Sequence, residues 1–497
     1  MEENLIAAIE LGSSAISGIV GQRFANGAMK VLAYVSLPSE SSIRHGVVYN
    51  TEKAASIIAE VIEKLKKASV CDINMLYVTH NGKSLSSSKT SVERVFDESK
   101  IVEDLDILNM QQECEAIPLE NKSRLFMYPQ EFTLDNKSIT EKDPIGVSCK
   151  TIRGDYLSVV MNSNLTDDVE RTFVRASVSV ADSFLSIINV ADYLLSADDR
   201  QQGCALVDFG ADTTTLSIYK NGVLKYLRVL PIGSSLITSD LATVLKIPYP
   251  EAEKLKTTYG LASLNSSQDL NETVMVNSRK ITIKEISAII EARNEEILRN
   301  LDAHIKNSDL GELLYAGIVV IGGGSNLRNL SKAIQKSVIN GDRVRFVREP
   351  ANSVEWVEPK WKKSDASQLS LLSMLAIDGE NCCERMIFDE IDHLSPIEES
   401  KVQQQSLFTD DGESVQELKD KLEAEKRAAE AQLRQNAAED ISEEAEQQPA
   451  KKTKTAGYSR VFGRMKNFME RIVDSTEGFF DADDDAEDEN NTNDTNQ

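Results

Sequence analysis

Three segments of this chain place glycine and hydroxyl side chains directly after an apolar run. They are Glu10-Leu11-Gly12-Ser13-Ser14, Asp208-Phe209-Gly210-Ala211-Asp212-Thr213-Thr214 and Gly322-Gly323-Gly324-Ser325. Glycine lets backbone N–H groups approach a phosphate closely, and Ser or Thr hydroxyls add donors. An acid at the head of such a turn can hold a magnesium ion, usually through water. Each turn taken alone has a simpler explanation, an ordinary glycine at the end of a strand. The sequence has no Walker A or GxGxxG pattern, which argues against P-loop and Rossmann proteins.

Strands and helices alternate along residues 1 to about 380. "LIAAIELG" and "ISGIVGQ" predict a hairpin, and "GCALVDFG" with "TTLSIYKNGVLKYLRVLPIG" predicts a second series that turns at Asn221-Gly222. "AGIVVIGGG" predicts a buried strand, followed by the helix "NLSKAIQKSV". "KAASIIAEVIEKLKKAS" predicts a helix with one apolar face, formed by Ala55, Ile58, Ala59, Ile62 and Leu65. This alternation predicts an α/β architecture.

Composition excludes several classes of protein. The net charge of −25 argues against nucleic-acid binding. The six cysteines form no CxxC and the four histidines lie far apart, so we expect neither a zinc site nor a disulfide scaffold. The N-terminus lacks the pattern of a signal peptide, and no apolar window reaches the roughly 18 residues of a membrane span. We expect a cytosolic protein.

After residue 384 the apolar pattern ends. Residues 385–456 are rich in Ala, Glu, Lys and Gln, and the apolar residues of "SVQELKDKLEAEKRAAEAQLRQNAAED" are too few for a coiled-coil seam. We expect a linker, either a solvated single helix or a disordered spacer. Residues 476–497 form an acidic tail, predicted to be disordered, with eight acids and no base from Asp481 onward.

Between the linker and the tail, residues 457–475 predict an amphipathic helix. Its apolar residues recur at steps of three and four, namely Tyr458, Val461, Phe462, Met465, Phe468, Met469, Ile472 and Val473. Bases including Arg464 and Lys466 lie on or beside the other face, and residues 451–473 carry seven bases against the single acid Glu470. Such a helix lies in the headgroup plane of an anionic membrane. The alternative is a helix that packs on the globular body or on a partner.

The order and spacing of the three glycine turns resemble those of the actin-like ATPases. Within that superfamily, "RHGVVYNTEKAASIIAEVIEKLKK", "YPQEFTLDNKSITEKDPIGVSC", "LPIGSSLITSDLATVLKIPYPEAEKLKTTYG" and "IIEARNEEIL" are similar to successive blocks of the bacterial cell-division protein FtsA. The terminal amphipathic helix is also a feature of that family.

The resemblance implies a site for ATP and Mg²⁺ between two lobes. The implied phosphate-binding residues are Gly12, Ser13, Ser14, Gly210, Thr213 and Thr214. The implied adenosine-binding residues are Glu253, Lys256, Gly322, Gly323, Gly324 and Ser325. Glu10 and Asp208 are the implied acids that hold Mg²⁺ through water.

The resemblance also implies a domain order. The first lobe comprises 1–84, 163–198 and a return at 351–384, and it is interrupted by an inserted FtsA-type subdomain at 85–162. The second lobe is 199–350, with a tip subdomain at about 240–305. The linker 385–456, the helix 457–475 and the tail 476–497 follow.

The function implied is a tether for the tubulin-like division protein FtsZ. We expect the chain to lie at the division site as a peripheral protein on the cytoplasmic face of the cell membrane, to self-associate into actin-like filaments and to recruit later division proteins. The C-terminal peptide of FtsZ would bind the tip, where Arg293 and Arg299 could meet its acids. Paired charges on an exposed helix are the alternative for both arginines. The implied lipid contacts are Val461, Phe462, Met465, Phe468, Met469, Ile472, Arg464 and Lys466. The rival functions are an active sugar kinase or chaperone-type ATPase of the superfamily, and a pilus-assembly relative.

This chain departs from the family pattern around the phosphates. Glu10 replaces the usual Asp, and Ile16 stands where a Lys is expected. In the second turn Ala211 and Asp212 replace glycines and Thr215 replaces an acid. These changes weaken the case for hydrolysis more than the case for binding, which rests on many backbone contacts. We therefore expect ATP binding with weak or absent turnover.

Overall fold

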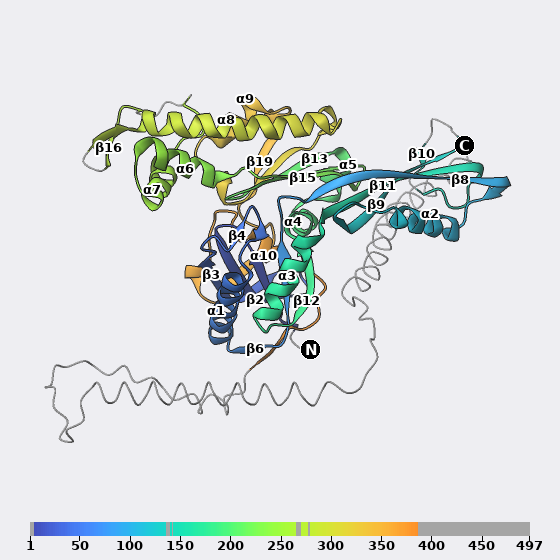
Figure 1. Ribbon diagram of the computed structural model, residues 1–497, viewed down its shortest axis with the longest axis horizontal. Helices are drawn as coiled ribbons and strands as arrows, with labels where there is room; N and C mark the ends of the chain where they lie inside the picture. Colours follow the sequence, from blue (N-terminus) through green and yellow to red (C-terminus); the bar gives the residue numbers. More distant parts are fainter. Residues whose placement is uncertain (1–3, 136–139, 142, 265–269, 277–278, 386–497) are drawn as a thin grey trace, which may run out of the picture. The chain divides into compact units, whose positions relative to one another are not determined.

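The computed structural model describes residues 4–135, 140–141, 143–264, 270–276 and 279–385 (Figure 1). All of them lie within one compact unit, Met1–Asp392. Strands and helices alternate through this unit, so the predicted α/β class is confirmed. Of the predicted linker only Arg385 is described. The predicted amphipathic helix at 457–475 and the acidic tail lie outside the described residues.

The first lobe is built on a sheet that joins the N-terminal strands to a strand from much later in the chain. Its order is β12 (Val180–Leu185), β7 (Leu76–His80), β1 (Ile6–Leu11), β2 (Ala15–Arg23), β3 (Met29–Pro38) and β20 (Val354–Trp356). β1 pairs antiparallel with β2, which confirms the first predicted hairpin, and parallel with β7. Thus β1 is a central strand, and its carboxyl end opens onto the turn that begins at Gly12.

Helices α1 (Thr51–Ser69), α3 (Ser163–Arg175), α4 (Ser186–Leu194) and α10 (Leu369–Leu375) pack on this lobe. α1 begins after Asn50, whose side chain accepts a hydrogen bond from the Lys53 N–H at 2.9 Å. The helix lies close to β2 at Gly18, where a Cβ atom would come within 2.6 Å of Leu65 Cδ1. The predicted apolar face was wrong at Ala59, which is exposed, because the face turned toward β2 is centred on Ile58, Val61 and Leu65.

The second lobe repeats this pattern in a longer sheet. Its order is β10 (Thr140–Glu141), β9 (Lys122–Leu134), β11 (Ser148–Asn162), β8 (Ser86–Ile101), β15 (Val223–Leu230), β14 (Thr214–Lys220), β13 (Cys204–Phe209), β18 (Gly317–Ile321) and β19 (Val344–Phe346). β13 pairs antiparallel with β14 and parallel with β18. Asn221 and Gly222 have φ values of 57° and 83°, the left-handed pair that a tight hairpin turn requires, so the predicted turn is confirmed.

Helices α6 (Ser234–Leu245), α7 (Tyr249–Tyr259), α8 (Ile283–Asn307) and α9 (Leu330–Ser337) share one hydrophobic core with strands of the second lobe. α8 starts at a capping box, in which Thr282 Oγ1 accepts from the Glu285 N–H at 3.1 Å and Glu285 Oε2 accepts from the Thr282 N–H at 2.8 Å. The helix predicted after the glycine turn is α9, so that prediction is confirmed.

The segment between Leu85 and Asn162 contains β8, α2 (Asp104–Ala116), β9, β10 and β11. In chain order it interrupts the first lobe, but its strands continue the sheet of the second lobe (Figure 1). The junction is at Ser86, which pairs with Arg228 of β15, and at Ser87, whose Oγ accepts from the Leu227 N–H at 2.9 Å. The domain ranges given above stay predictions.

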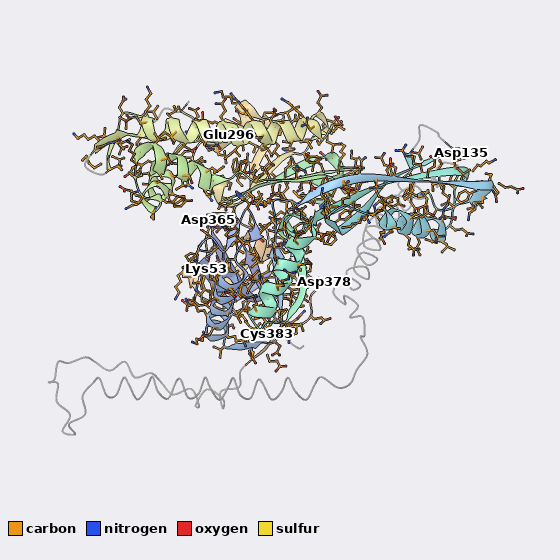
Figure 2. All side chains as sticks on the ribbon, viewed as in Figure 1. Lys53, Asp135, Glu296, Asp365, Asp378 and Cys383 are labelled. Carbon is orange, nitrogen blue, oxygen red and sulfur yellow. The ribbon has the colours of Figure 1, made fainter. Side chains whose placement is uncertain are left out.

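Short elements complete the described part of the chain. They are β4 (Ile43–Arg44), β5 (Val47–Val48), β6 (Cys71–Ile73), α5 (Ala197–Gln202), β16 (Thr273–Val276), β17 (Arg279–Thr282), β21 (Cys383–Arg385) and 3₁₀ turns at Gly311–Leu313, Gly323–Asn326, Gly341–Arg343 and Pro359–Trp361. β21 pairs with β6 and returns the chain to the first lobe, at the place where Figure 2 labels Cys383.

The packing of α1 on β2 predicts a stability difference between two neighbouring positions. Ile58→Ala removes a fully buried side chain, and we expect a loss of about 2–5 kcal/mol in the free energy of unfolding, measured by urea denaturation. Ala59→Ser on the exposed face is the matched control and should change it by only about 0.5 kcal/mol. Equal losses for the two variants would contradict the described packing of α1.

Candidate functional site

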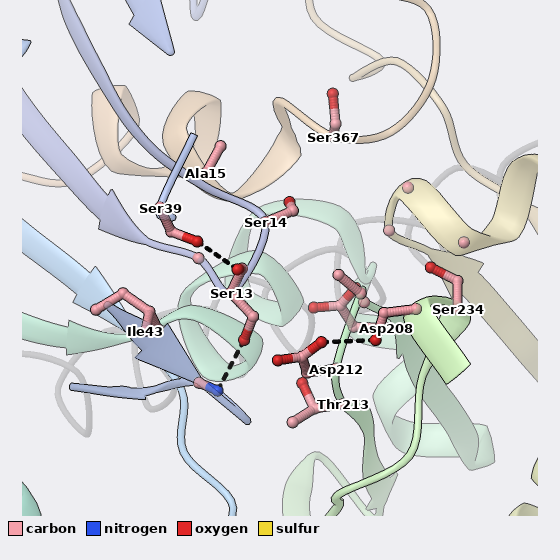
Figure 3. A pocket seen from close by; sticks show the side chains of 18 of the residues that line it. Ser13, Ser14, Ala15, Ser39, Ile43, Asp208, Asp212, Thr213, Ser234 and Ser367 are labelled. Carbon is pink, nitrogen blue, oxygen red and sulfur yellow. Dashed lines mark hydrogen bonds between the residues drawn. The ribbon is translucent and has the colours of Figure 1, made fainter. Parts of the chain in front are cut away.

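A cavity of about 1010 Å³ lies where the carboxyl ends of β1 and β13 face each other (Figure 3). The first lobe contributes the turn after β1, the loop 39–46 and the end of β7. The second lobe contributes the turn after β13, the start of α6, one face of α7 and the glycine turn after β18. The structure therefore brings the three turns singled out in the sequence to one site.

The turn after β1 is closed by the Gly12 N–H, which donates to Ala15 O at 3.1 Å. Gly12, Ser13 and Ser14 all line the cavity. Ser13 Oγ accepts a hydrogen bond from the Gly46 N–H at 2.9 Å, and this leaves its own O–H free to donate to a ligand. Ser39 Oγ donates to Ser13 O at 2.5 Å and fixes loop 39–46 against the turn.

The turn after β13 has the same closure, from the Gly210 N–H to Thr213 O at 2.9 Å. The Ser234 and Ser235 N–H groups at the start of α6 donate to Gly210 O and Ala211 O at 3.1 and 2.8 Å. Gly210 and Thr213 line the cavity, whereas Thr214 does not. Thr214 is fully buried and its Oγ1 donates to Ile232 O at 2.9 Å, because the strand alternation of β14 turns this side chain into the lobe.

The glycine turn after β18 approaches the second hairpin closely. Gly322 has φ 86°, and a Cβ atom there would lie 2.1 Å from Asp208 Oδ1, so only glycine fits at this position. Gly322, Gly323 and Gly324 line the cavity as predicted. Ser325 does not, because the 3₁₀ turn Gly323–Asn326 buries it to 1% exposure.

On α7, the predicted residues Glu253 and Lys256 both line the cavity. Lys256 Nζ lies 2.8 Å from Glu253 Oε2 and donates to Thr238 Oγ1 at 2.9 Å and to Ser234 O at 3.2 Å. Thr238 Oγ1 in turn donates to Glu253 at 2.5 Å. This network ties α7 to α6 and holds the ion pair at the cavity wall, with the Lys256 side chain buried and Glu253 more exposed.

Glu10 and Asp208 stand at equivalent places in the two lobes. Burial raises the pKa of Glu10 to about 7, and the negative charge of Asp208 adds to this rise while a hydrogen bond with Ser370 opposes it. Burial raises the pKa of Asp208 to about 6. When two buried acids lie close together, a cation between them favours their ionised forms, because its charge offsets their negative charges. Within the described residues no group of three or more His, Cys, Asp or Glu side chains is arranged to hold a metal directly. The carboxylate oxygens of Glu10 and Asp208 are the type of donor that a magnesium ion prefers, directly or through water.

Two features of the cavity were missed from the sequence. Loop 39–46 contributes His45, and the end of β7 contributes His80 and Asn81. Burial lowers the pKa of His80, whose Nε2 lies 3.1 Å from Ser183 Oγ, so a neutral imidazole faces the site. "RHGVV" is the sequence signal for the loop, but only the fold shows that it meets the turn after β1.

The residues that depart from the family pattern occupy defined places. Ile16 is fully buried in β2, so it provides no cation for a phosphate. Thr215 is buried within β14 and replaces an acid there. Asp212 lines the cavity, where its carboxylate accepts from Ser235 Oγ at 2.6 Å and from the His45 N–H at 3.3 Å.

Arg293 and Arg299 lie on α8, and both are paired with acids. Arg293 forms a two-point contact with Asp240 of α6, at 2.6 and 3.1 Å, and a further contact with Glu296, labelled in Figure 2, at 2.5 Å. Arg299 pairs with Glu295 at 2.7 Å. The structure thus favours the alternative of paired charges for both residues. The predicted lipid-contact residues lie outside the described residues, and none of the helices in the described ranges is long and apolar enough to cross a membrane.

Comparisons with known proteins agree with this geometry. A family model described as "Cell division protein FtsA" matches residues 205–368. The FtsA protein of Borreliella burgdorferi is 28% identical over 344 residues, which cover 68% of this chain and 83% of that protein. FtsA of Escherichia coli K12 is 23% identical over 350 residues, which cover 67% and 82%. The predicted resemblance to FtsA is confirmed.

A solved structure described as "PilM-PilN type IV pilus biogenesis complex" has a TM-score of 0.53 and 15% identity, and the match covers 75% of this chain and 97% of that one. At this identity the likeness concerns the fold alone. The predicted actin-like α/β fold in two lobes is confirmed for the described residues.

The raised pKa of Glu10 predicts a pH dependence of stability in the absence of Mg²⁺ and nucleotide. An acid whose pKa is higher in the folded state stabilises the fold below its unfolded value of 4.5, and this stabilisation is lost as the pH rises to about 7. The unfolding free energy of Glu10→Gln should therefore fall less than that of wild type across this range. The expected difference is at most about 3 kcal/mol, since Glu10 keeps some contact with solvent.

Urea unfolding in EDTA at a series of pH values measures this difference. Glu40→Gln is the matched control, because Glu40 lines the same cavity but pairs with Lys53 at 2.9 Å on the exposed rim. Parallel pH profiles for wild type and Glu10→Gln would show that Glu10 ionises normally in the folded protein.

Proposed function

Since this chain is a homologue of the FtsA cell-division proteins, we propose that it binds Mg-ATP, self-associates into actin-like filaments and tethers FtsZ filaments to the cytoplasmic membrane. The observation that carries the proposal is the convergence of two acid-led turns and a glycine turn on one cavity. The same convergence is what a nucleotide clamped between two lobes requires.

The polyphosphate would be held mainly by the two turns. Gly12, Ser13 and Ser14 offer backbone N–H groups and hydroxyls from the first lobe, and Gly210 and Thr213 do so from the second. Thr214 and Ser325 have no part in this, because both are turned away from the cavity. The nucleoside would lie between the glycine turn and α7, where Glu253, 2.8 Å from Lys256 Nζ, can accept from sugar hydroxyls.

Glu10 and Asp208 would hold Mg²⁺ through water between the two lobes. When bound, the ion would offset the charge of the phosphates and of these two acids. Because each lobe contributes one acid, ligand binding would favour the arrangement in which the lobes are close together. Filament formation would then depend on the bound nucleotide.

Hydrolysis should be weak or absent. Ile16 leaves the first turn without a lysine, and Asp212 adds a negative charge beside the phosphates where the family has glycine. These features reduce the stabilisation of charge in a transition state, whereas binding retains the backbone donors of both turns. ATP would act as a structural ligand.

The tethering part of the proposal rests on the homologues and on residues 457–475. The apolar stripe and its seven neighbouring bases suit the headgroup layer of an anionic membrane, where each base contributes about 1 kcal/mol. The tip at about 240–305 would bind the C-terminal peptide of FtsZ. Arg293 is committed to Asp240, so the peptide must be recognised by other residues of the tip or by a rearranged Arg299. Later division proteins would bind the inserted segment.

The paired acids predict a magnesium-dependent affinity for ATP. Asp208→Asn should weaken the binding of Mg-ATP about tenfold and change the binding of ATP in EDTA much less, because the lost charge acts through the metal. Isothermal titration calorimetry on the full chain measures both, with exposed Asp342→Asn as the control. Equal effects with and without Mg²⁺ would argue against a metal at these acids, and rapid phosphate release by wild type under saturating ATP would refute the weak turnover.

The terminal stripe predicts membrane recruitment. The full chain should co-sediment with anionic liposomes and carry purified FtsZ with it, while a chain truncated after residue 456 stays in solution. Met465→Glu should abolish sedimentation, since it places a charge in the apolar stripe, and Asn467→Gln on the polar side is the matched control. If the full chain and the truncation both remain in solution, the segment contacts a protein surface and the tethering proposal fails.

A further inference from the structure

Asp212 makes two contacts that join the lobes at the cavity. It belongs to the turn after β13 in the second lobe, and its carboxylate accepts a hydrogen bond at 3.3 Å from the backbone N–H of His45 in the first lobe. The Asp212 backbone O lies 3.2 Å from His45 Nδ1, so one residue meets the other twice. Loop 39–46 is itself fixed by Ser13 Oγ through the Gly46 N–H at 2.9 Å.

The second carboxylate oxygen of Asp212 is used within its own lobe. Ser235 Oγ donates to Asp212 Oδ1 at 2.6 Å, in the first turn of α6 (Figure 3). The partial positive charge at a helix N-terminus stabilises a carboxylate in this position. The Asp212 side chain is therefore held between the His45 N–H of the first lobe and the start of α6 in the second lobe. His45, Asp212 and Ser235 all line the cavity.

The same donors would suit the terminal phosphate of a nucleotide. His45, Asp212 and Ser235 border the cavity together with Ser13 and Thr213, which the proposed function assigns to phosphates. The Asp212 carboxylate already accepts hydrogen bonds from the His45 N–H and the Ser235 O–H, so a third phosphate cannot use these two donors unless it displaces the carboxylate. It also repels the additional charge that this phosphate brings.

We propose that Asp212 is a specificity-determining residue: its carboxylate links loop 39–46 to α6 across the cavity and disfavours nucleoside triphosphate relative to diphosphate. The proposal rests on the proposed nucleotide site. With the carboxylate in place, the two lobes are held together by the chain itself, and ATP must displace these hydrogen bonds to bring its terminal phosphate close to the second turn. ADP, which lacks that phosphate, leaves them intact.

Calorimetric titrations of the full chain with ATP and with ADP, in excess Mg²⁺, test the selectivity. Asp212→Gly and Asp212→Asn should each lower the ratio of the Kd for ATP to the Kd for ADP about tenfold, because both remove the charge. Glu40→Gln removes a charge from the same cavity without a link across it and should leave the ratio unchanged.

Hydrogen exchange without nucleotide tests the link separately. The His45 amide should exchange about tenfold faster in Asp212→Gly, whereas Asp212→Asn keeps an acceptor oxygen and should exchange nearly as wild type does. Unchanged exchange in Asp212→Gly overturns the link. If both variants bind nucleotide with the same ratio of the Kd for ATP to the Kd for ADP as wild type, the selectivity alone is overturned. If wild type binds neither nucleotide, the proposed site and the selectivity are overturned together.

Discussion

The site depends on two buried carboxylic acids at matching positions of the two sheets, because ionising them inside the protein costs free energy. Glu10 lies in β1 and Asp208 in β13, and each of these strands pairs antiparallel with the following strand and parallel with a third. Burial raises the pKa of both acids. Near neutral pH the protein therefore bears a cost for keeping them ionised, and a cation between them offsets that cost.

Glycines stand where the backbone passes close to Asp208 and to the turn after β13. The turn at Gly322 passes so close to Asp208 Oδ1 that no side chain fits between them. Gly233 is similarly close to the turn after β13, where a Cβ atom would lie 2.3 Å from Ala211 O. Because Gly233 fits there, the first N–H groups of α6 reach the carbonyls of Gly210 and Ala211. These backbone contacts fix the start of α6 against the turn after β13 at the cavity wall.

Local signals in the sequence were enough for the two hairpin series, for the strand before Gly322 and for the helices α1 and α9. The hairpin at Asn221-Gly222 and the strand before Gly322 depend on residues adjacent in the chain, and both were predictable. The burial of Thr214 and Ser325 was not visible in the sequence, because composition does not show which way a side chain points. Their direction depends on the alternation of β14 and on a 3₁₀ turn, which tertiary packing sets.

Other parts of the site depend on contacts between distant residues. Loop 39–46 meets the turn after β13 through His45 and Asp212, which are 167 residues apart. Arg293 looked available on its helix, but Asp240, 53 residues earlier, takes up its guanidinium. No local pattern contains such pairs. The sequence therefore predicted the types of residue at the site better than their partners.

The inserted segment between Leu85 and Asn162 is hydrogen-bonded to the sheet of the second lobe. Its strands join the second-lobe sheet through β8 and β15, and β15 leads directly into the stretch before α6. Thr214 Oγ1 bonds to Ile232 O in that same stretch, so the turn after β13, α6 and the inserted strands share one hydrogen-bonded framework. The chain order places the inserted segment within the first lobe, but this framework joins its strands to the second lobe.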